Sequence, residues 1–457
     1  MTRRRRVGVL GLARSGRAAA MLALSRGEHV FASDAGDSIE MRTAADEIRA
    51  LGGEAETGGH SVAKLAACDV IVVSPGIPPD AEVLRDEQVR AVPRISELEY
   101  GFQALTSPVL AVTGTNGKST TTALAAHLLR AAEYDAPAAG NIGVALSEVA
   151  LRPKKPDWIV VEASSFQLAD IDTFAPSIGV VTNLSPDHLD RYESVAAYYA
   201  DKANLFRNAT PSSRWVLNGE DTAVRALPGG APGERREFRV STPLAAGLSG
   251  GFVRDGVLVL RDEEREEPLL AASALPLFGE HNRANALAAA VAASVAGAGP
   301  ASIRRGLGTF QGLEHRLEVV ADRDDVLWIN DSKATNIAST IVALRSMTRP
   351  TVLLLGGRHK GEAYTALLEA LRGRVRAVIA YGEAATIVEA DLRDHLPIER
   401  VTGGFDAVVE RAASLALPGD VVLLSPACAS YDMFRDYEDR GRAFRTRVAA
   451  LVEKAHG

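Results

Sequence analysis

The fold is decided by one stretch, Val109-Leu110-Ala111-Val112-Thr113-Gly114-Thr115-Asn116-Gly117-Lys118-Ser119-Thr120. Its apolar beginning predicts a buried strand, and the residues after Lys118 predict a helix. Glycines between a strand and a helix free backbone N–H groups to bind phosphate oxygens, and the helix N-terminus adds the positive end of its dipole. The stretch therefore predicts a nucleoside-triphosphate site.

Individual residues of this stretch have expected roles. Lys118 would neutralise the β and γ phosphates, and the Ser119 hydroxyl would ligate Mg²⁺. Val112 occupies the position where the usual pattern has its first glycine, so we expect a shortened loop. The remaining ATP contacts are expected from Gly114, Thr115, Asn116, Gly117 and Thr120. The alternative is a glycine-rich turn before an ordinary helix.

Two predicted strands that follow the loop end in polar side chains. The strand at 158–161 is followed by Glu162, a carboxylate placed to hold Mg²⁺, although Glu162 could instead cap a helix. The strand at 178–182 leads into a polar cluster over 183–192 that contains His188. His188 is either a metal ligand or a capping or surface histidine, and its spacing alone does not decide between them.

Similar units repeat along the rest of the chain, each an apolar run, a glycine or polar turn, and a helical stretch. This pattern predicts an α/β protein with mostly parallel sheets. We expect a Rossmann-like domain over 1–98, a central phosphate-loop ATPase domain over 99–313 and a Rossmann-like domain over 314–457. Residues 228–266, rich in Gly, Pro and charge, predict loops with short antiparallel strands. Strands are predicted at 7–10, 29–32, 70–73, 109–113, 158–161, 178–182, 352–355, 377–381 and 421–424.

The first of these units approximates a dinucleotide fingerprint, Gly11-Leu12-Ala13-Arg14-Ser15-Gly16, with Asp34 at the end of the second strand. Ala13 replaces the glycine that lets the backbone approach a pyrophosphate, so the pattern favours a nucleotide other than NAD. Arg14, Ser15 and Asp34 are candidate ligands, and Ser74 would lie on the same sheet edge. The alternative is a tight turn with Asp34 as a surface cap.

Composition excludes several functional classes for this chain of 457 residues. A formal charge of -7 offers no basic surface for nucleic acid. Two cysteines, Cys68 and Cys428, make neither a disulfide framework nor a zinc site. No run approaches the roughly 18 apolar residues of a membrane span, and the basic start at Arg3 is not followed by the apolar h-region of a signal peptide. We expect a monomeric cytoplasmic protein without membrane or nucleic-acid partners.

Several motifs together resemble the Mur ligase family, the ATP-dependent amide ligases of bacterial cell-wall (peptidoglycan) synthesis. They lie, in the family's order, at 113–120, 162–168, 187–190, 279–285, 314–316 and 330–336. Asp331-Ser332-Lys333-Ala334-Thr335-Asn336, with Ser425–Ser430 written Ser-Pro-Ala-Cys-Ala-Ser, resembles the members that add D-glutamate. The Asp-Asn-Pro-Arg signature of the members that add a diamino acid is absent, and folylpolyglutamate synthetases share only the ATP half.

The resemblance implies ATP-dependent addition of D-glutamate to UDP-N-acetylmuramoyl-L-alanine through an acyl phosphate. It implies that Ser119 and Glu162 hold one Mg²⁺, and that His188 and a carbamylated Lys202 hold a second. A free lysine with a pKa near 10.4 would repel a metal, whereas a carbamate supplies an anionic oxygen. From the residues alone, Lys202 is only a helix-surface lysine.

The resemblance also implies a role for residues outside the phosphate loop. Asn282 and Asn285, three apart at a helix start, would meet the adenine, although a capped helix is the alternative. Arg316 and Asp331 would reach the nucleotide from the third domain, while Asn141 and His188 would lie near the muramoyl group. The first domain would hold the uridine nucleotide. D-glutamate would be surrounded by Lys333, Thr335, Lys360, Ser430 and Tyr437.

Two rival functions remain open on sequence alone. One is a regulatory or NAD-dependent nucleotide-binding protein built on the first domain. The other is a related Mur ligase, or a ligase similar to folylpolyglutamate synthetase, that uses a different amino acid.

Overall fold

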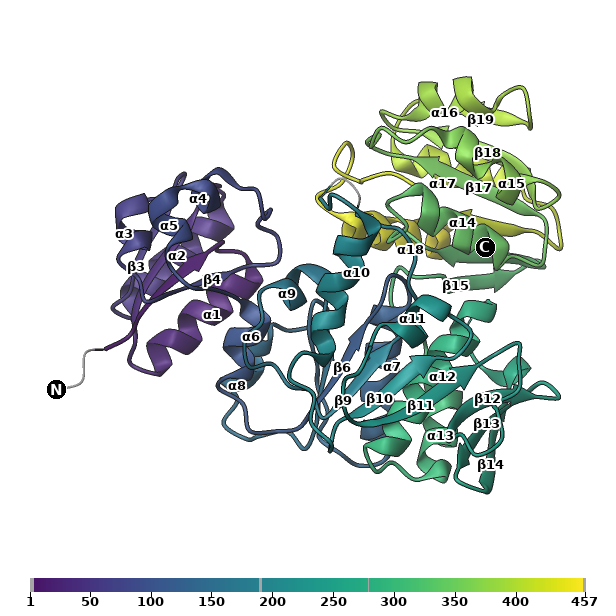
Figure 1. Cartoon of the computed structure of the whole chain (residues 1–457). Helices are drawn as coiled ribbons and strands as arrows, with labels where there is room; N and C mark the ends of the chain where they lie inside the picture. Colours follow the sequence, from purple (N-terminus) through teal and green to yellow (C-terminus); the bar gives the residue numbers. More distant parts are fainter. Residues whose placement is uncertain (1–3, 189–190, 278, 455–457) are drawn as a thin grey trace. The chain divides into compact units, whose positions relative to one another are not determined.

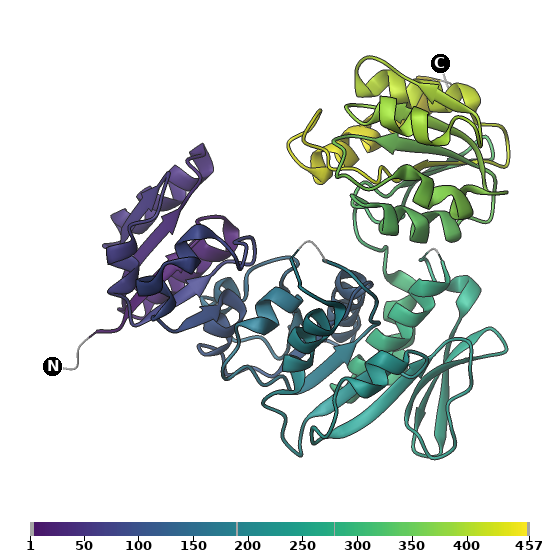
Figure 2. The ribbon, with the colours of Figure 1, turned by 45° about the horizontal axis from the view of Figure 1, so that its top comes forward.

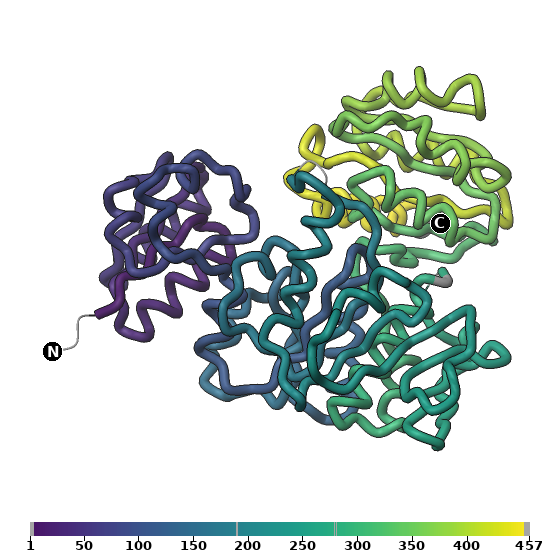
Figure 3. Tube along the Cα trace, in the orientation of Figure 1, coloured from purple at the N-terminus to yellow at the C-terminus, as the bar shows by residue number. Residues whose placement is uncertain are grey.

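The computed structural model describes residues 4–188, 191–277 and 279–454. Arg3 of the basic start, and Leu189 and Asp190 of the 187–190 motif, lie outside these ranges. The chain divides into two compact units, Met1–Leu275 with Arg283–Phe310, and Pro276–Asn282 with Gln311–Gly457. Figure 3 shows the trace of the chain coloured by residue number. No helix in the described ranges combines the length and apolar character needed to cross a membrane.

The first unit begins with a parallel sheet in the order β3-β2-β1-β4-β5 (Figure 1). Along β4, Val70 and Val72 join one buried cluster, and Ile71 and Val73 join another. Because side chains alternate along a strand, this sheet is covered on both faces, as parallel sheets usually are. Its strands are β1 (Arg6–Leu10), β2 (His29–Asp34), β3 (Glu54–Thr57), β4 (Val70–Val73) and β5 (Arg94–Ser96), with helices α1 (Arg14–Ser25), α2 (Ile39–Ala50), α3 (Val62–Ala66), α4 (Glu82–Arg85) and α5 (Glu87–Arg90).

The central sheet of the same unit has the order β14-β13-β12-β11-β10-β9-β6-β8-β7. It is parallel from β7 to β12, and β12, β13 and β14 are antiparallel at its outer edge (Figure 2). Its strands are β6 (Val109–Thr113), β7 (Ala138–Gly140), β8 (Ile159–Glu162), β9 (Ile178–Val181), β10 (Arg214–Asn218), β11 (Glu234–Arg239), β12 (Gly250–Arg254), β13 (Val257–Asp262) and β14 (Arg265–Ala271). The helices are α6 (Glu97–Phe102), α7 (Lys118–Ala131), α8 (Leu146–Ala150), α9 (Ser165–Ala169), α10 (Val195–Ala203), η1 (Asn204–Phe206), α11 (Thr222–Ala226), η2 (Ala272–Ala274), α12 (Glu280–Val295) and α13 (Pro300–Thr309).

The second unit contains a sheet in the order β15-β16-β20-β17-β18-β19, parallel except for the β15–β16 pair. Successive residues of β17 again join opposite clusters, so helices cover both of its faces. The strands are β15 (Glu318–Arg323), β16 (Val326–Asn330), β17 (Thr351–Gly356), β18 (Val375–Tyr381), β19 (Ile398–Arg400) and β20 (Val421–Leu424). The helices are α14 (Ile337–Arg345), η3 (Tyr364–Leu367), α15 (Leu368–Leu371), α16 (Ala385–Leu392), α17 (Phe405–Leu415) and α18 (Tyr437–Lys454).

The α/β class, with mostly parallel sheets and Rossmann-like first and last sheets, is confirmed. Each predicted strand coincides with an observed one to within a few residues. The predicted strands did not include β3, β5, β7, β10, β15, β16 or β19. The expectation of antiparallel strands over 228–266 was wrong for β11, which pairs in parallel with β10. The predicted domain limits at 98 and 313 stay predictions.

Helix α6 follows the first sheet and carries two buried glutamates, Glu97 and Glu99. The Glu99 carboxylate accepts hydrogen bonds from the backbone N–H groups of Asp172, Thr173 and Phe174 and from the Thr173 hydroxyl, at 2.6–3.1 Å. Burial alone would raise the pKa of Glu99, but these hydrogen bonds lower it overall. Glu99 therefore stabilises the loop after α9 in its ionised form.

Replacing Glu99 with glutamine is expected to lower the free energy of unfolding by about 2–4 kcal/mol, because the amide group faces N–H donors. The pKa of Glu99 is lower in the folded state, so its contribution is present above the ordinary glutamate pKa of about 4.3 and is lost as the pH falls through the folded value. Urea unfolding at pH 7 and pH 3.5 measures this difference. Glu148→Gln, at an exposed position, is the control. If the difference in unfolding free energy between Glu99→Gln and wild type is as large at pH 3.5 as at pH 7, Glu99 does not act in its ionised form.

Candidate functional site

The predicted phosphate loop lies between the end of β6 and the start of α7, and only Gly114 to Gly117 connect them. Gly114 has φ +138°, and a Cβ there would lie 2.1 Å from Thr182 Oγ1. Gly117 has φ +83°, and a Cβ there would lie 2.2 Å from Asn285 Oδ1. Both positions therefore require glycine. The shortened loop expected from Val112 is observed.

Residues at the end of β9 form hydrogen bonds with this loop. Sequence reasoning did not predict this supporting role. Asn183 accepts Thr115 N through its carbonyl at 2.8 Å and Asn116 N through Oδ1 at 2.9 Å. Thr182 Oγ1 donates to the Asn116 carbonyl at 2.6 Å. Lys118 Nζ lies over the loop and donates to the Thr115 carbonyl at 2.8 Å. The polar cluster that follows β9 was the available signal, because parallel strand ends meet at one edge of the sheet.

Glu162 is the last residue of β8, the strand beside β6, and it is 2% exposed. Its Oε1 accepts Asn141 Nδ2 at 2.9 Å, whereas Oε2 is buried and has no hydrogen-bond partner within the described part of the chain. The interpretation of Glu162 as a helix cap is wrong, because Ser164 caps α9 in a capping box with Gln167. A buried carboxylate oxygen without a partner fits a bound cation.

Lys202 is 1% exposed, so the interpretation as a surface lysine is wrong. Its Nζ donates to the Gly114 carbonyl at 2.7 Å and lies 4.5 Å from the centre of the Tyr198 ring. Burial, helped by the charge of Lys118, lowers the pKa of Lys202 to about 6, although Asp187 and Glu162 oppose the shift. The amine is therefore largely neutral at pH 7.

Two aromatic rings pack against the His188 side chain. The His188 ring contacts Phe166 edge-on at 5.2 Å between centroids and Tyr198 at 6.0 Å. Tyr198 OH also donates to Thr115 Oγ1 at 3.4 Å. Tyr198, which sequence reasoning did not single out, thus connects His188 with the loop and with Lys202.

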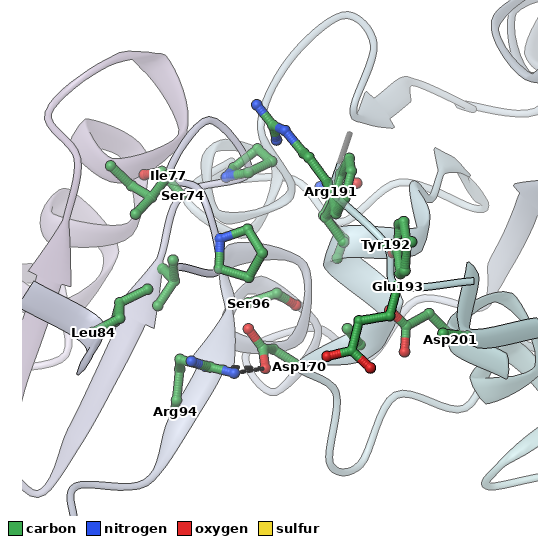
Figure 4. A pocket seen from close by; sticks show the side chains of 17 residues that line it. Ser74, Ile77, Leu84, Arg94, Ser96, Asp170, Arg191, Tyr192, Glu193 and Asp201 are labelled. Carbon is green, nitrogen blue, oxygen red and sulfur yellow. Dashed lines mark hydrogen bonds and ion pairs between the residues drawn. The ribbon is translucent and has the colours of Figure 1, made fainter. Parts of the chain in front are cut away.

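A cavity of about 340 Å³ lies near these residues (Figure 4). Ser74 and Ile77 line it from the segment after β4, whereas Tyr192 and Asp201 line it from α10 and the loop before it. Arg94 and Asp170 form an ion pair at 3.1 Å across its base. Ser74, a residue predicted from the first sheet, therefore shares a cavity with the segment that follows His188.

The other candidate ligand-binding residues of the N-terminal segment lie at the carboxyl edge of the first sheet. Asp34 is 7% exposed and accepts Leu12 N at 2.7 Å and Gly36 N at 2.8 Å, so it is not a surface cap. Arg14 is exposed and Ser15 is half-buried at the start of α1. Ser74 Oγ donates to the carbonyl of Gly11 at 3.5 Å. Ligand contacts by these residues stay predictions.

Asp331 follows β16 in the second unit and is deeply buried. Ser425 Oγ donates to it at 2.9 Å and Leu317 N at 3.2 Å. Burial raises the pKa of Asp331 to about 7, although Ser425 and the charge of Arg316 oppose the shift. The charges of Arg316 and Asp331 thus interact within this unit, and contacts of either residue with a nucleotide stay predictions.

The candidate D-glutamate-binding residues of this unit lie on loops, except for Tyr437, which begins α18. Lys333 Nζ lies 5.7 Å from the centre of the Tyr437 ring. Fully buried Arg440 of α18 donates to Ser332 O and Oγ and to the Cys428 carbonyl, which joins the loop of Lys333 to the loop of Ser430. Sequence reasoning missed Arg440, because α18 reads as a charged surface helix. Thr335 is half-buried, and Lys360, in the loop after β17, is exposed. Asn282, a candidate for adenine binding, is buried in the first turn of α12.

A side chain of α12 reaches the phosphate loop within the first unit. Thr121 Oγ1 donates to Asn285 Oδ1 at 3.4 Å, close to Gly117. A group of three or more His, Cys, Asp or Glu side chains able to hold a metal is absent from the ranges described.

Family models match three parts of the chain. They are the MurD N-terminal domain at 6–83, the Mur ligase middle domain at 112–293, and the glutamate ligase domain of Mur ligases at 315–428. Two solved structures share the fold: a pseudomurein peptide ligase type C from Methanothermus fervidus (TM-score 0.60, 18% identity, 98% of this chain and 100% of that chain) and MurF from Acinetobacter baumannii (TM-score 0.60, 17% identity, 93% and 91%).

Full-length relatives share much more of the sequence. A UDP-N-acetylmuramoylalanine–D-glutamate ligase of Salinibacter ruber is 42% identical over 98% of this chain and 99% of its own length. A protein of the same name from Anaeromyxobacter dehalogenans is 41% identical over 96% of each chain. The chain belongs to the Mur ligase family.

Proposed function

We propose that this protein is an ATP-dependent amide ligase that joins UDP-N-acetylmuramoyl-L-alanine to D-glutamate in peptidoglycan precursor synthesis. One observation carries the proposal. The phosphate loop, the unpartnered Glu162 oxygen and the neutral buried amine of Lys202 meet at one sheet edge, in a chain 42% identical to a ligase of that name.

The reaction has two steps. A carboxylate oxygen of the alanyl group attacks the γ-phosphorus of ATP in line, the bond to the β-phosphate oxygen breaks, and an acyl phosphate and ADP result. The D-glutamate amine then attacks the acyl carbon, loses a proton and expels inorganic phosphate. Both reactants of the first step are anionic, so Lys118 supplies positive charge and the loop fixes the phosphates in line.

The oxygen donors at the loop suit Mg²⁺ rather than a softer metal. We assign Ser119 and Glu162 to one Mg²⁺, and His188 with a carbamylated Lys202 to a second. The two ions would offset the charge repulsion between carboxylate and triphosphate. Glu162 fits this role because Asn141 satisfies one of its oxygens and leaves the buried second oxygen for a cation.

Carbamylation of Lys202 fits its environment. Only a neutral amine adds to CO₂; the new N–C bond forms, a proton is released and an anionic carbamate remains. Because the pKa of Lys202 is lowered to about 6, its amine is available at neutral pH, whereas an exposed lysine is almost wholly protonated there.

The remaining candidates are assigned by the chemistry of the three substrates. The edge formed by Arg14, Ser15, Asp34 and Ser74 takes the uridine nucleotide, and Asn141 and His188 lie toward the muramoyl group. Asn282 and Asn285 bind adenine, and Arg316 and Asp331 contact the nucleotide. Lys333, Thr335, Lys360, Ser430 and Tyr437 bind D-glutamate, where two ammonium groups match two carboxylates. A monomeric state and a cytoplasmic location stay predictions.

The test is ADP release by the purified protein with each substrate omitted in turn. We expect ADP only when ATP, UDP-N-acetylmuramoyl-L-alanine and D-glutamate are all present, with L-glutamate, L-lysine and meso-diaminopimelate as controls. Release with a diamino acid but not D-glutamate would favour a different Mur ligase. ADP release that needs no amino acid would overturn the ligase assignment. NAD binding without any ADP release would favour the alternative of a regulatory or NAD-dependent nucleotide-binding protein.

A further inference from the structure

We propose that Glu97 of α6 is a positioning residue for the Glu162 carboxylate and acts through α8 and Asn141. The inference rests on the proposed function, because it takes Glu162 as a Mg²⁺ ligand. It assigns a role in the metal site to a helix that lies outside the phosphate loop and its neighbouring strand ends. Three structural links, each described below, connect the two glutamates.

The first link joins Asn141 to Glu162 at two points. Asn141 Nδ2 donates to Glu162 Oε1 at 2.9 Å, and Asn141 N donates to the Glu162 carbonyl at 3.0 Å. The side-chain bond fixes the rotation of the carboxylate, so the buried Oε2 has one direction in which to face a ligand. Hydrogen bonds of this kind orient metal-binding carboxylates in proteins.

The second link is the tight segment between Asn141 and α8. Gly140 has φ +90°, and a Cβ there would lie 2.4 Å from the Glu162 carbonyl, so the segment touches β8 directly. Gly140 N donates to the Val144 carbonyl at 2.9 Å, which folds the segment back on itself. Helix α8 then begins at Leu146. A shift of the first turn of α8 is therefore passed to Asn141 through a short, hydrogen-bonded loop.

The third link holds that first turn against α6. Glu97 is 0% exposed, and its Oε1 accepts Ser147 N at 2.7 Å. One turn along α6, a Cβ on Gly101 would lie 2.7 Å from Ser147 N and 2.8 Å from the Leu146 carbonyl carbon. The two helices are thus in backbone contact, with the Glu97 carboxyl as the polar connection between them.

Glu99 attaches α6 to a second segment, which follows Glu162 in the sequence. Its carboxylate holds the backbone of Asp172–Phe174, downstream of β8 and α9. Glu97 and Glu99 together hold the segments before and after the strand that ends in Glu162. Burial raises the pKa of Glu97, so the group tends toward the neutral acid, which glutamine mimics.

The test measures metal binding rather than turnover. Mn²⁺ is titrated into the protein with a non-hydrolysable ATP analogue, and free Mn²⁺ is followed by electron paramagnetic resonance. We expect Glu97→Leu and Asn141→Ala to weaken Mn²⁺ binding about 10-fold, because outer groups of this kind contribute that much to metal affinity. Glu97→Gln keeps an acceptor oxygen for Ser147 N and should bind Mn²⁺ as the wild type does. ADP binding in EDTA should be unchanged in all of them.

The controls separate this inference from the proposed function. Glu162→Gln should weaken Mn²⁺ binding at least as much, and if it does not, the metal assignment of Glu162 fails rather than the link from Glu97. If Glu162→Gln weakens Mn²⁺ binding but Glu97→Leu does not, the proposal is overturned, even if Glu97→Leu lowers the melting temperature. Equal weakening by Glu97→Gln and Glu97→Leu would also overturn it. Should Glu97→Leu not fold, Gly101→Ala displaces α8 with Glu97 intact and is expected to weaken Mn²⁺ binding; unchanged binding would contradict the proposal.

Discussion

Replacing Lys118 with alanine is expected to reduce D-glutamate-dependent ADP release by at least about 10²–10³-fold, the usual cost of losing one charge-stabilising group. Lys118 begins α7, and its ammonium lies over the phosphate loop against the Thr115 carbonyl. Without it, the anionic carboxylate approaches the γ-phosphate with less compensation. Initial rates of ADP release at saturating ATP measure the loss.

Exposed Lys154→Ala is the matched control and should keep the wild-type rate, because it removes the same charge far along the sequence from the loop. Circular dichroism should be unchanged in both variants. A folded Lys118→Ala protein that forms product at the normal rate would refute the two-step scheme.

Replacing Lys202 with methionine is expected to reduce the rate more than about 100-fold, because the proposed second Mg²⁺ would lose a ligand. The variant should stay folded, since methionine has a similar length and adapts readily to buried sites. With ¹³C-bicarbonate, the wild type should show a carbamate resonance by ¹³C NMR that the variant lacks.

The pH dependence of that resonance follows from the lowered pKa of Lys202. The amine is neutral above about pH 6 and protonated below it, so the signal should be present at pH 7–8 and disappear as the pH falls through about 6. Lys155→Met, an exposed control, should leave the resonance unchanged. Full activity of Lys202→Met, or no Lys202-dependent resonance at pH 8, would contradict the carbamate.

The proposed metal site combines residues that the sequence identified with residues it did not. Glu162 and Ser119 were found because each follows a strand or a glycine turn, where local pattern predicts position. Asn183 lies in the polar cluster that the sequence identified, although its contact with the loop was not predicted, and Tyr198 has no comparable local signal. Both nevertheless form hydrogen bonds with Thr115 from other segments. Near a site, a polar side chain that binds a ligand can be distinguished from one that holds the loop in place only by its hydrogen bonds. Those hydrogen bonds depend on tertiary packing.

Local periodicity was enough to establish the α/β class, the phosphate loop between a buried strand and a helix, and the carboxylate at the end of the neighbouring strand. Such features follow from residues close together in the chain, because strand and helix periods and glycine conformations are local properties. The burial of Lys202, the engagement of Asp34 by backbone amides, and the hold of Arg440 on two loops depended on tertiary structure. Each arises from contacts between distant segments, and it is desolvation by those segments that turns an ordinary lysine into a neutral amine at physiological pH.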